Sequence, residues 1–358
     1  MKLRIVCALL LLSLLLGVNA VLSRPASPHR EQARARNVIL MIGDGMGAEH
    51  IRATGLRQNG RAGSLALESL PHRAEVITDS TEGTTDSAAA ATAMATGQKV
   101  ENGVLSVALP GDGRPLTTVL ELAAARNRRV GLVTTSFLED ATPAAFAAHS
   151  PTRDAHPAIA REYFDTTRPQ LLFGGRTDFC TPEQAQKAGY AVLDEAADLE
   201  KLPQGEYLAG LFGPGGPLPY EYDGNYAGIP RLTDMTRAAL DALEEAPHGF
   251  FLLVENENID SAAHENHLER TVSAVSELDR TVKLVLEWAG SRRDTLILVT
   301  GDHETGGLQY FEDGGPRWST KGHTRWPVLA FATGPGAEQI RGTLDNTDLC
   351  RIMMEAVR

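Results

Sequence analysis

The sequence predicts an α/β fold with a mainly parallel central sheet and helices on both of its faces. Short apolar runs with the length of buried strands alternate with longer segments of helical periodicity. The composition, 42% apolar and 22% charged over 358 residues, is that of a globular protein able to bury a sizeable core. No internal repeat or linker divides the chain, so we expect one domain over residues 37–358.

The expected elements follow the apolar pattern along the chain. The alanine-rich run from Ala88 to Gly97 predicts a helix, because alanine favours helices and glycine commonly ends them. Two stretches, Gly213–Pro230 and His303–His323, interrupt the alternation, and we expect long loops near the working face. For the first, a surface loop without a role is an equally good interpretation. Strands are expected at Val38–Ile42, Val130–Thr134, Leu171–Phe173, Phe250–Glu255, Thr295–Thr300 and Val328–Ala332, and further helices at Thr117–Arg126, Leu232–Glu245, Ser261–Trp288 and Asn346–Ala356.

The first 20 residues are typical of a secretory signal peptide. Lys2 and Arg4 precede the apolar stretch Ile5–Val18, and Val18-Asn19-Ala20 is a small-residue cleavage pattern. An uncleaved membrane anchor is the alternative, but a spanning helix usually needs about 20 apolar residues. Residues 21–36, which are rich in arginine, predict a flexible leader. We therefore expect an exported protein, periplasmic or extracellular, with no membrane span after cleavage.

The net charge restricts the class of binding partner, and the cysteine content bears on a possible disulfide. Loss of Lys2 and Arg4 with the signal peptide would take the net charge from −12 to −14. Such an acidic protein is not expected to bind nucleic acid specifically, so a phosphate-bearing substrate needs a local positive site. Cys180 and Cys350 remain after cleavage. An oxidising compartment permits a disulfide between them, and the sequence is equally compatible with two buried thiols.

Asp44 follows the first expected strand, within Gly43-Asp44-Gly45-Met46-Gly47-Ala48. This segment superficially matches the G-x-G-x-x-[GA] pattern of dinucleotide-binding folds. A carboxylate between the first two glycines would face an incoming pyrophosphate, so the position suits a divalent metal better. In open α/β sheets, ligands bind at this carboxyl end of the strands.

A serine precedes the alanine-rich helix, in Thr84-Thr85-Asp86-Ser87. An ordinary helix N-cap is the simplest interpretation of these residues. A serine there can also be a nucleophile, because the helix dipole and the free N–H groups stabilise an alkoxide or a bound phosphate. The sequence offers no evident histidine base, so a metal is the expected activator.

Carboxylates and histidines gather just past several strand ends. Asp260 and His264 are spaced i, i+4, which places them on one helix face. Each residue alone could be a cap, a core histidine or a solvated charge, but together they indicate a metal centre at one sheet edge. The set consists of Asp140, Thr142, His149 and Arg153, then Glu255, Asp260 and His264, and finally Asp302, His303 and His323.

Five blocks of the chain, taken in order, resemble the alkaline phosphatase family. They are Met41–Gly47, Thr85–Gly97, Asp140–Arg153, Glu255–His264, and Gly301–Thr305 together with His323-Thr324. The resemblance implies an alkaline-phosphatase-like fold and the hydrolysis of small phosphate monoesters to an alcohol and inorganic phosphate. It implies a covalent phosphoserine at Ser87, and two zinc ions and one magnesium ion per chain.

Carried over by position, the resemblance also implies a role for each site residue. Arg153 would clamp phosphate oxygens and Asp86 would position it. Mixed histidine and carboxylate ligands suit zinc, and an all-oxygen set suits magnesium. The first zinc would take Asp260, His264 and His323; the second Asp44, Asp302 and His303, approached by Ser87; and magnesium Asp44 as a bridge, Asp140, Thr142 and Glu255.

Some features depart from the family pattern. Asn256-Glu257-Asn258 replaces residues that are often small, so Glu257 competes with Glu255 as a ligand, although the strand-end position favours Glu255. Ser261 stands where relatives often have a basic or aromatic residue. The chain is also short, which leaves both a homodimer, common among relatives, and a monomer open.

Two other functions compete with this one. A phosphodiesterase or another phosphoryl- or sulfuryl-transfer enzyme of the same superfamily is the nearest, and a non-catalytic metal- or phosphate-binding protein is the more distant. Arg153 and a complete third metal site favour monoesters over diesters.

Overall fold

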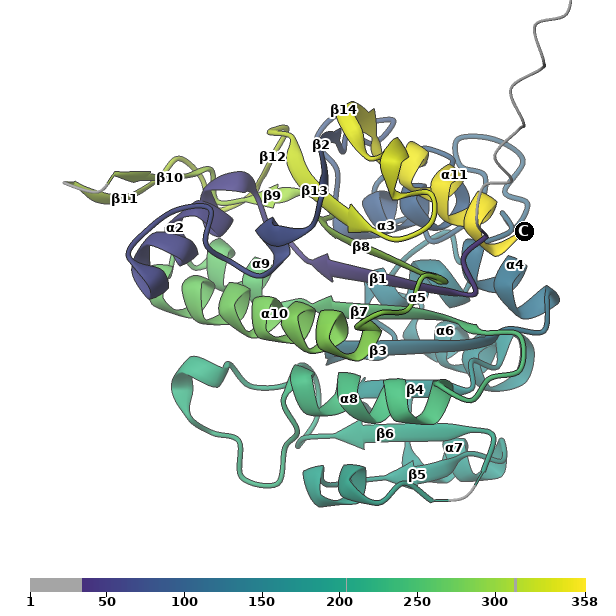
Figure 1. Cartoon of the computed structure of the whole chain (residues 1–358). Coiled ribbons are helices and arrows are strands. Elements are labelled where there is room, and N and C mark those ends of the chain that lie inside the picture. Colours follow the sequence, from purple (N-terminus) through teal and green to yellow (C-terminus); the bar gives the residue numbers. More distant parts are fainter. Residues whose placement is uncertain (1–33, 204, 312–313) are drawn as a thin grey trace, which may run out of the picture. The chain divides into compact units, whose positions relative to one another are not determined.

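The computed structural model describes residues 34–203, 205–311 and 314–358. The predicted signal peptide, and the predicted leader up to residue 33, lie outside the described residues. Residues 34–358 form one compact unit. Its centre is a ten-stranded sheet with the order β14-β2-β13-β8-β1-β7-β3-β4-β6-β5 (Figure 1). The strands are β1 (Asn37–Gly43), β2 (His72–Ile77), β3 (Arg129–Phe137), β4 (Leu171–Gly175), β5 (Ala191–Leu193), β6 (Leu208–Phe212), β7 (Phe250–Asn256), β8 (Thr295–Gly301), β13 (Val328–Thr333) and β14 (Arg341–Asp345).

The sheet is mainly parallel, as predicted. Strand β13 is the exception, since it runs antiparallel to both β2 and β8. The four central strands β8, β1, β7 and β3 are in register, because Ile42 pairs with both Thr300 and Glu255, and Glu255 pairs with Thr134. Their carboxyl ends therefore meet at one edge, and the segments that follow them start side by side.

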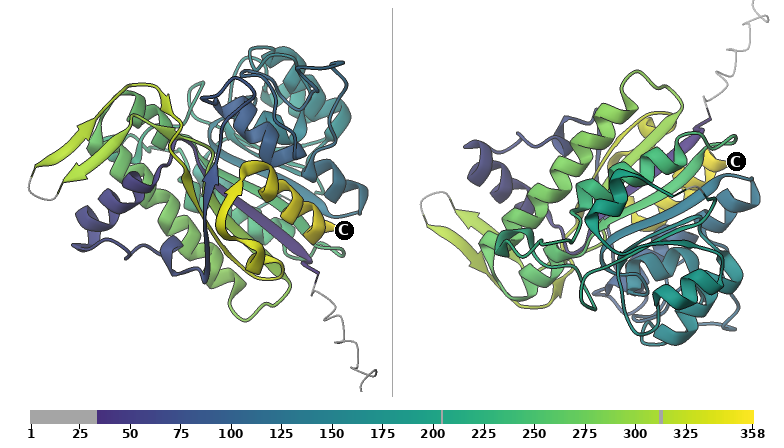
Figure 2. Two further views of the ribbon diagram at one scale, coloured as in Figure 1. Left: turned by 90° about the horizontal axis from the view of Figure 1, so that it is seen from above. Right: turned by 90° about the horizontal axis from the view of Figure 1, so that it is seen from below.

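Helices cover both faces of the sheet, and β1 shows why. Its side chains alternate between faces: Val38, Leu40 and Ile42 join one buried apolar cluster, whereas Ile39 and Met41 join another. Helices α8 and α10 lie on one face and α3, α5 and α11 on the other (Figure 2). The α-helices are α2 (Ala48–Asn59), α3 (Ser87–Thr96), α4 (Val119–Ala125), α5 (Ala141–Ala147), α6 (His156–Glu162), α7 (Pro182–Lys187), α8 (Leu232–Leu243), α9 (Asn258–His264), α10 (Leu268–Ala289) and α11 (Asn346–Val357).

All six predicted strands are present, but the prediction of one helix over Ser261–Trp288 is wrong. The segment forms two helices, α9 and α10, separated by three residues. Asn266 takes a left-handed conformation at φ 57°, which a helix cannot continue through. The side chain of His267 then caps α10 by accepting the Arg270 N–H at 3.3 Å.

The two stretches predicted as loops differ in outcome. The predicted loop His303–His323 instead contains β9 (Glu304–Thr305), β10 (Leu308–Phe311) and β11 (Gly315–Trp318), and it ends in β12 (His323–Thr324), which pairs with β9. Strands β10 and β11 form a hairpin that projects beyond the main sheet (Figure 1). Gly213–Pro230 is irregular apart from one short turn of helix, and Pro219 O accepts a bond from Asn258 at the start of α9. This loop therefore borders the carboxyl edge of the sheet.

The cysteines are two separate thiols. Cys180 and Cys350 are both free and buried, so the disulfide interpretation is wrong and the interpretation as buried thiols is confirmed. Among the described residues, no helix is both long and apolar enough to cross a bilayer.

Candidate active site

Ser87 is the first residue of α3 and lies in the middle of the site. Asp86 is the N-cap of the helix and accepts the Ala89 N–H at 3.0 Å. The Ser87 hydroxyl is buried, 3.5 Å from Asp44 Oδ1 and 3.2 Å from His303 Nε2. The cap therefore directs the Ser87 side chain toward the carboxyl ends of β1 and β8. The histidine beside the serine is His303, which the family resemblance grouped with Ser87 as a metal ligand.

Arg153 is held between two carboxylates. Its Nη1 lies 3.3 Å from Asp86 Oδ2 and its Nη2 lies 3.0 Å from Asp140 Oδ1. Burial by itself would lower the pKa of Arg153, but the Asp140 and Asp86 carboxylates raise it above its ordinary value. The side chain is 32% exposed, so a fixed cation is presented to an incoming anion. Asp86 therefore contacts the guanidinium group that it is expected to position.

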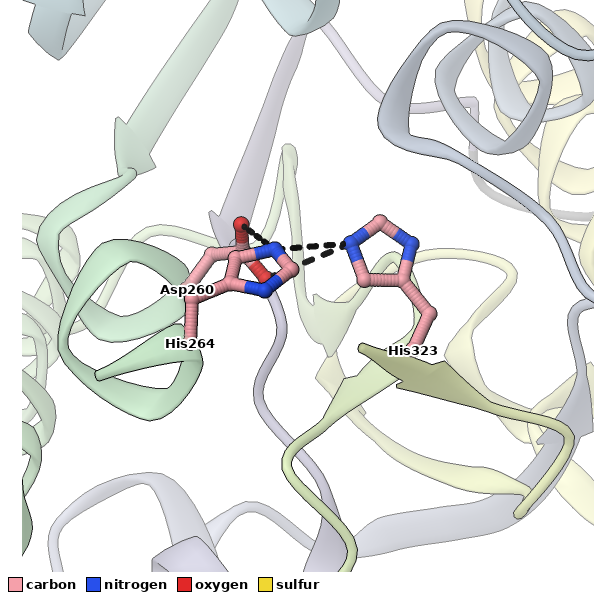
Figure 3. A group of neighbouring side chains, drawn as sticks. All are labelled: Asp260, His264 and His323. Atoms are coloured by element: carbon pink, nitrogen blue, oxygen red, sulfur yellow. Dashed lines mark hydrogen bonds and ion pairs between the residues drawn. The ribbon is translucent and has the colours of Figure 1, made fainter. Parts of the chain in front are cut away.

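A first cluster of ligand-type side chains consists of Asp260, His264 and His323 (Figure 3). Asp260 and His264 project from α9, and His323 faces them from β12. His264 Nε2 lies 3.1 Å from Asp260 Oδ2 and 3.1 Å from His323 Nε2. The i, i+4 spacing thus places Asp260 and His264 on one helix face, as predicted.

Charge explains the protonation of this cluster in the metal-free protein. The hydrogen bond that His264 donates to Asp260 raises the pKa of His264 to about 9, against the opposing effect of burial. Burial would raise the pKa of Asp260, but the hydrogen bond from His264 and the charges of the neighbouring histidines hold it below its usual range. Without a metal, a protonated His264 beside an ionised Asp260 is the stable pair at neutral pH.

A second cluster surrounds His303. Its Nε2 atom lies 3.4 Å from Asp44 Oδ1 and 3.2 Å from Asp302 Oδ2. Ligand atoms of Asp44, Asp260 and His303 all lie within 4.8 Å of one another, so Asp260 belongs to both clusters. Asp302 Oδ1 is fixed by the N–H groups of Gly45 and His303, at 2.9 and 2.8 Å, whereas its Oδ2 has no hydrogen-bond partner.

Burial and mutual repulsion govern the charges of the second cluster. Burial raises the pKa of Asp302 to about 7. Burial, followed by the charges of Asp302 and Asp260, raises the pKa of Asp44 well above its ordinary value. Burial lowers the pKa of His303, which leaves a neutral imidazole. Packed carboxylates around a neutral histidine, with one carboxylate oxygen unpartnered, fit a divalent cation.

The predicted all-oxygen set has a different geometry. Glu255 Oε2 accepts the Thr134 hydroxyl, and Asp140 Oδ2 accepts the Ser136 hydroxyl at 2.6 Å. Burial and the Asp140 charge raise the pKa of Glu255 to about 8. Thr142 is buried, and a hydrogen bond from its side chain partly offsets this rise in the pKa of Glu255. Asp140 and Glu255 are not among the described residues that gather within 4.8 Å as the two clusters do.

Glu257 lies beside this set. Its Oε1 accepts the Ser261 hydroxyl one helical turn along, and its Oε2 is buried without a partner. Glu255 is the penultimate residue of β7, in register with Thr134, whereas Glu257 already belongs to the start of α9. The strand-end position therefore still distinguishes Glu255 from its neighbour.

Thr305 is a site residue to which the sequence assigned no role. It is fully buried in β9 and hydrogen bonds to Asp260 and to His303, 45 and two residues away. A lone threonine carries no signal for such a contact in the sequence. His149, in contrast, does not join the site, because its ring bonds to Glu162 Oε1 at 2.9 Å and to Leu116 O at 3.1 Å.

Comparison with known proteins identifies relatives along most of the chain. The family model described as alkaline phosphatase matches residues 35–170 and 160–315. Alkaline phosphatase 3 of Bacillus subtilis (strain 168) is 33% identical over 333 residues, covering 88% of this chain and 70% of that protein. Streptomycin-6-phosphate phosphatase of Streptomyces griseus is 34% identical over 421 residues, covering 94% of each.

A solved structure has the same fold. The crystal structure of a cold-active alkaline phosphatase from Shewanella sp. matches with a TM-score of 0.83 at 27% identity, covering 90% of this chain and 100% of that chain. The fold, the site and the relatives therefore agree, and the chain belongs to the alkaline phosphatase family of phosphomonoester hydrolases.

Proposed function

We propose that this enzyme transfers the phosphoryl group of a monoester to Ser87 and then to water, with two zinc ions and one magnesium ion as cofactors. The observation that carries the proposal is the position of Ser87 Oγ at the start of α3, within 3.5 Å of Asp44 and 3.2 Å of His303 in the second cluster, directly after Asp86, whose carboxylate contacts Arg153. A serine that served only as a helix cap would need none of these neighbours.

The donor atoms of the clusters support the identity of the ions. Asp260, His264 and His323 would hold the first zinc, and Asp44, Asp302 and His303 the second, since both sets mix nitrogen and oxygen. Asp44, Asp140, Thr142 and Glu255 offer only oxygen and would hold magnesium. When bound, these ions lower the pKa of a hydroxyl and neutralise charge on the oxygens that enter and leave phosphorus.

The chain's own residues would then perform the transfer. Ser87 Oγ loses its proton to solvent and bonds to phosphorus while the bond to the alcohol oxygen breaks; the departing alcohol oxygen takes up a proton, and the free N–H groups of α3 stabilise the phosphate. Water next loses a proton and attacks the same phosphorus, the bond to Ser87 Oγ breaks, Ser87 regains its proton, and inorganic phosphate leaves. Arg153 binds two phosphate oxygens throughout, and Asp86 and Asp140 keep its guanidinium aligned.

The test is a Ser87→Ala variant, with Ser276→Ala as its matched control. Ser276 is also a buried helical serine, and its hydroxyl has no hydrogen-bond partner. Zinc and magnesium contents of all proteins are measured first, followed by turnover of a phosphate monoester and a phosphate diester. We expect S87A to bind metals but lose at least about 1,000-fold in kcat, and acid-quenched wild type to carry phosphate on Ser87.

S276A should behave as wild type. Unchanged turnover by S87A, or a clear preference for the diester, would refute the proposal.

We further propose export to the periplasm or the outside medium. The support is the segment from Lys2 to Ala20, whose charge, apolar stretch and small-residue end are those of a signal peptide. N-terminal sequencing of the protein recovered outside the cytoplasm should begin at Val21, whereas retention of Met1 would contradict it.

A further inference from the structure

We propose that Thr305 is a positioning residue that couples the two ligand clusters through its single hydroxyl group. The inference rests on the proposed function, because it takes Asp260 and His303 as metal ligands. Thr305 is fully buried, donates a hydrogen bond to Asp260 Oδ1, and lies 3.2 Å from His303 Nδ1.

The direction of these two bonds follows from the atoms involved. An ionised carboxylate only accepts, so the one hydroxyl proton of Thr305 goes to Asp260. The remaining contact is possible only if His303 Nδ1 carries a proton and donates it to the Thr305 oxygen. His303 is therefore fixed in the tautomer whose Nε2 lone pair is free, and this atom lies 3.2 Å from Ser87 Oγ.

Asp260 transmits the effect to the other cluster. One of its oxygens is held by Thr305, and the other lies 3.1 Å from His264 Nε2. Because Asp260 belongs to both ligand groups, a rotation of its carboxylate would disturb both at once. The Thr305 hydroxyl thus orients Asp260, which belongs to both ligand groups, and His303, which belongs to one.

The backbone holds Thr305 in place from two sides. Its N–H donates to Gly45 O at 3.1 Å, next to Asp44, and in the β9–β12 pair it stands opposite His323. A Cβ atom at Gly45 would lie 2.6 Å from Asp260 Oδ1 and 2.9 Å from Thr305 Oγ1. Only glycine leaves room for this pair of side chains, so the contact is closely packed.

The experiment measures metal binding in the metal-free full-length enzyme. Thr305→Val keeps the shape and removes the hydroxyl, Thr305→Ala removes it with less bulk, and Thr305→Ser retains it. Thr236→Val is the matched control, because Thr236 is buried in α8 and its hydroxyl has no partner. Affinity and stoichiometry for Zn²⁺ are measured by competition with a chromophoric chelator, and the visible spectrum of the Co²⁺-substituted enzyme reports histidine coordination.

We expect T305V and T305A to lose about 10- to 100-fold in Zn²⁺ affinity. T305S and T236V should retain the wild-type affinity and spectrum. Wild-type affinity and spectrum in either hydroxyl-free variant that folds, as judged by circular dichroism, would overturn the inference. The proposed function itself fails instead if the wild type binds fewer than two ions, or binds them without hydrolysing a monoester.

Discussion

His264 Nε2 and His323 Nε2 face each other at a distance of 3.1 Å, although each ring already bonds a backbone carbonyl oxygen through Nδ1. His323 Nδ1 lies 2.8 Å from Thr85 O, and His264 Nδ1 bonds Lys321 O. If both Nδ1 atoms carry protons, the two Nε2 atoms cannot both be neutral at this distance without opposing lone pairs. A cation between them, either a proton or a metal ion, resolves the conflict.

Metal binding should therefore release protons. The pKa of His264, a proposed ligand in the first cluster, is raised to about 9 by its hydrogen bond to Asp260, so this histidine is largely protonated at pH 7 without metal. A group with a raised pKa holds its proton until the pH passes that value, and metal must displace it. Zinc affinity should rise about tenfold per pH unit between pH 6 and 8 for each proton displaced.

Calorimetry in buffers of different ionisation enthalpy measures the released protons directly. Affinity that is independent of pH, with no buffer-dependent heat, would contradict this account of the first cluster.

Removing the metals should also lower thermal stability. Asp44, Asp260 and Asp302 are buried close to one another, and without cations their repulsion acts against the folded state. An ion present at 100 times its Kd stabilises the folded protein by about 2.7 kcal/mol. We expect the Tm in scanning calorimetry to fall by several degrees in excess chelator. Chelator saturated with zinc and magnesium is the control, and an unchanged Tm would argue against metal sites in these clusters.

The Arg153→Lys variant should bind substrate poorly while keeping its charge. Lysine cannot reproduce two parallel bonds to phosphate, nor contact Asp86 and Asp140 at once. Loss of one charge-assisted bond of about 2 kcal/mol corresponds to a rise of about 30-fold in KM. Arg325→Lys is a suitable control, because Arg325 also grips a carboxylate, Asp79, with two nitrogens, but it is exposed. Equal kinetic effects of the two substitutions would show that Arg153 has no special role.

Glu255→Gln and Glu257→Gln should separate the two candidate magnesium ligands. Glu255 is fixed at the end of β7 by Thr134, whereas Glu257 is held by Ser261 at the start of α9. We expect E255Q to lose its magnesium, measured by atomic emission, with zinc retained and activity reduced at least about tenfold. E257Q should retain magnesium. The opposite result would make Glu257 the ligand.

Much of the fold could be predicted, because the central strands are continuous apolar runs. Strands β2, β5, β6 and β14 were not predicted. Strand β2 is buried on one face only and β14 is largely exposed, so neither forms such a run. Strand β5 has only three residues, and the buried strand β6 is short and contains Gly210. The break between α9 and α10 was not predicted, for another reason. Helical periodicity continues on both sides, and the left-handed conformation of Asn266 decides the break.

The site divides in a similar way. The proposed ligands were predicted from ordered motifs that resemble a family, and several of them lie at or just past the ends of strands. The contacts that orient these ligands were not predicted. Hydrogen bonds from a hydroxyl group, such as that from Thr305 to Asp260, join residues that are distant in the sequence. Such contacts leave no periodicity or spacing to detect, and only the folded chain brings them together.

The alignment of strands β8, β1, β7 and β3 also has a consequence for when the metal site can form during synthesis of the chain. Its proposed metal ligands begin at Asp44 and end at His323, so they are drawn from nearly the whole length of the chain. A polypeptide that has emerged only as far as residue 322 lacks one side of the first cluster, and β13, which flanks β8, has not yet been made. Metal capture must therefore be one of the last events of biogenesis, after nearly all of the chain has been synthesised.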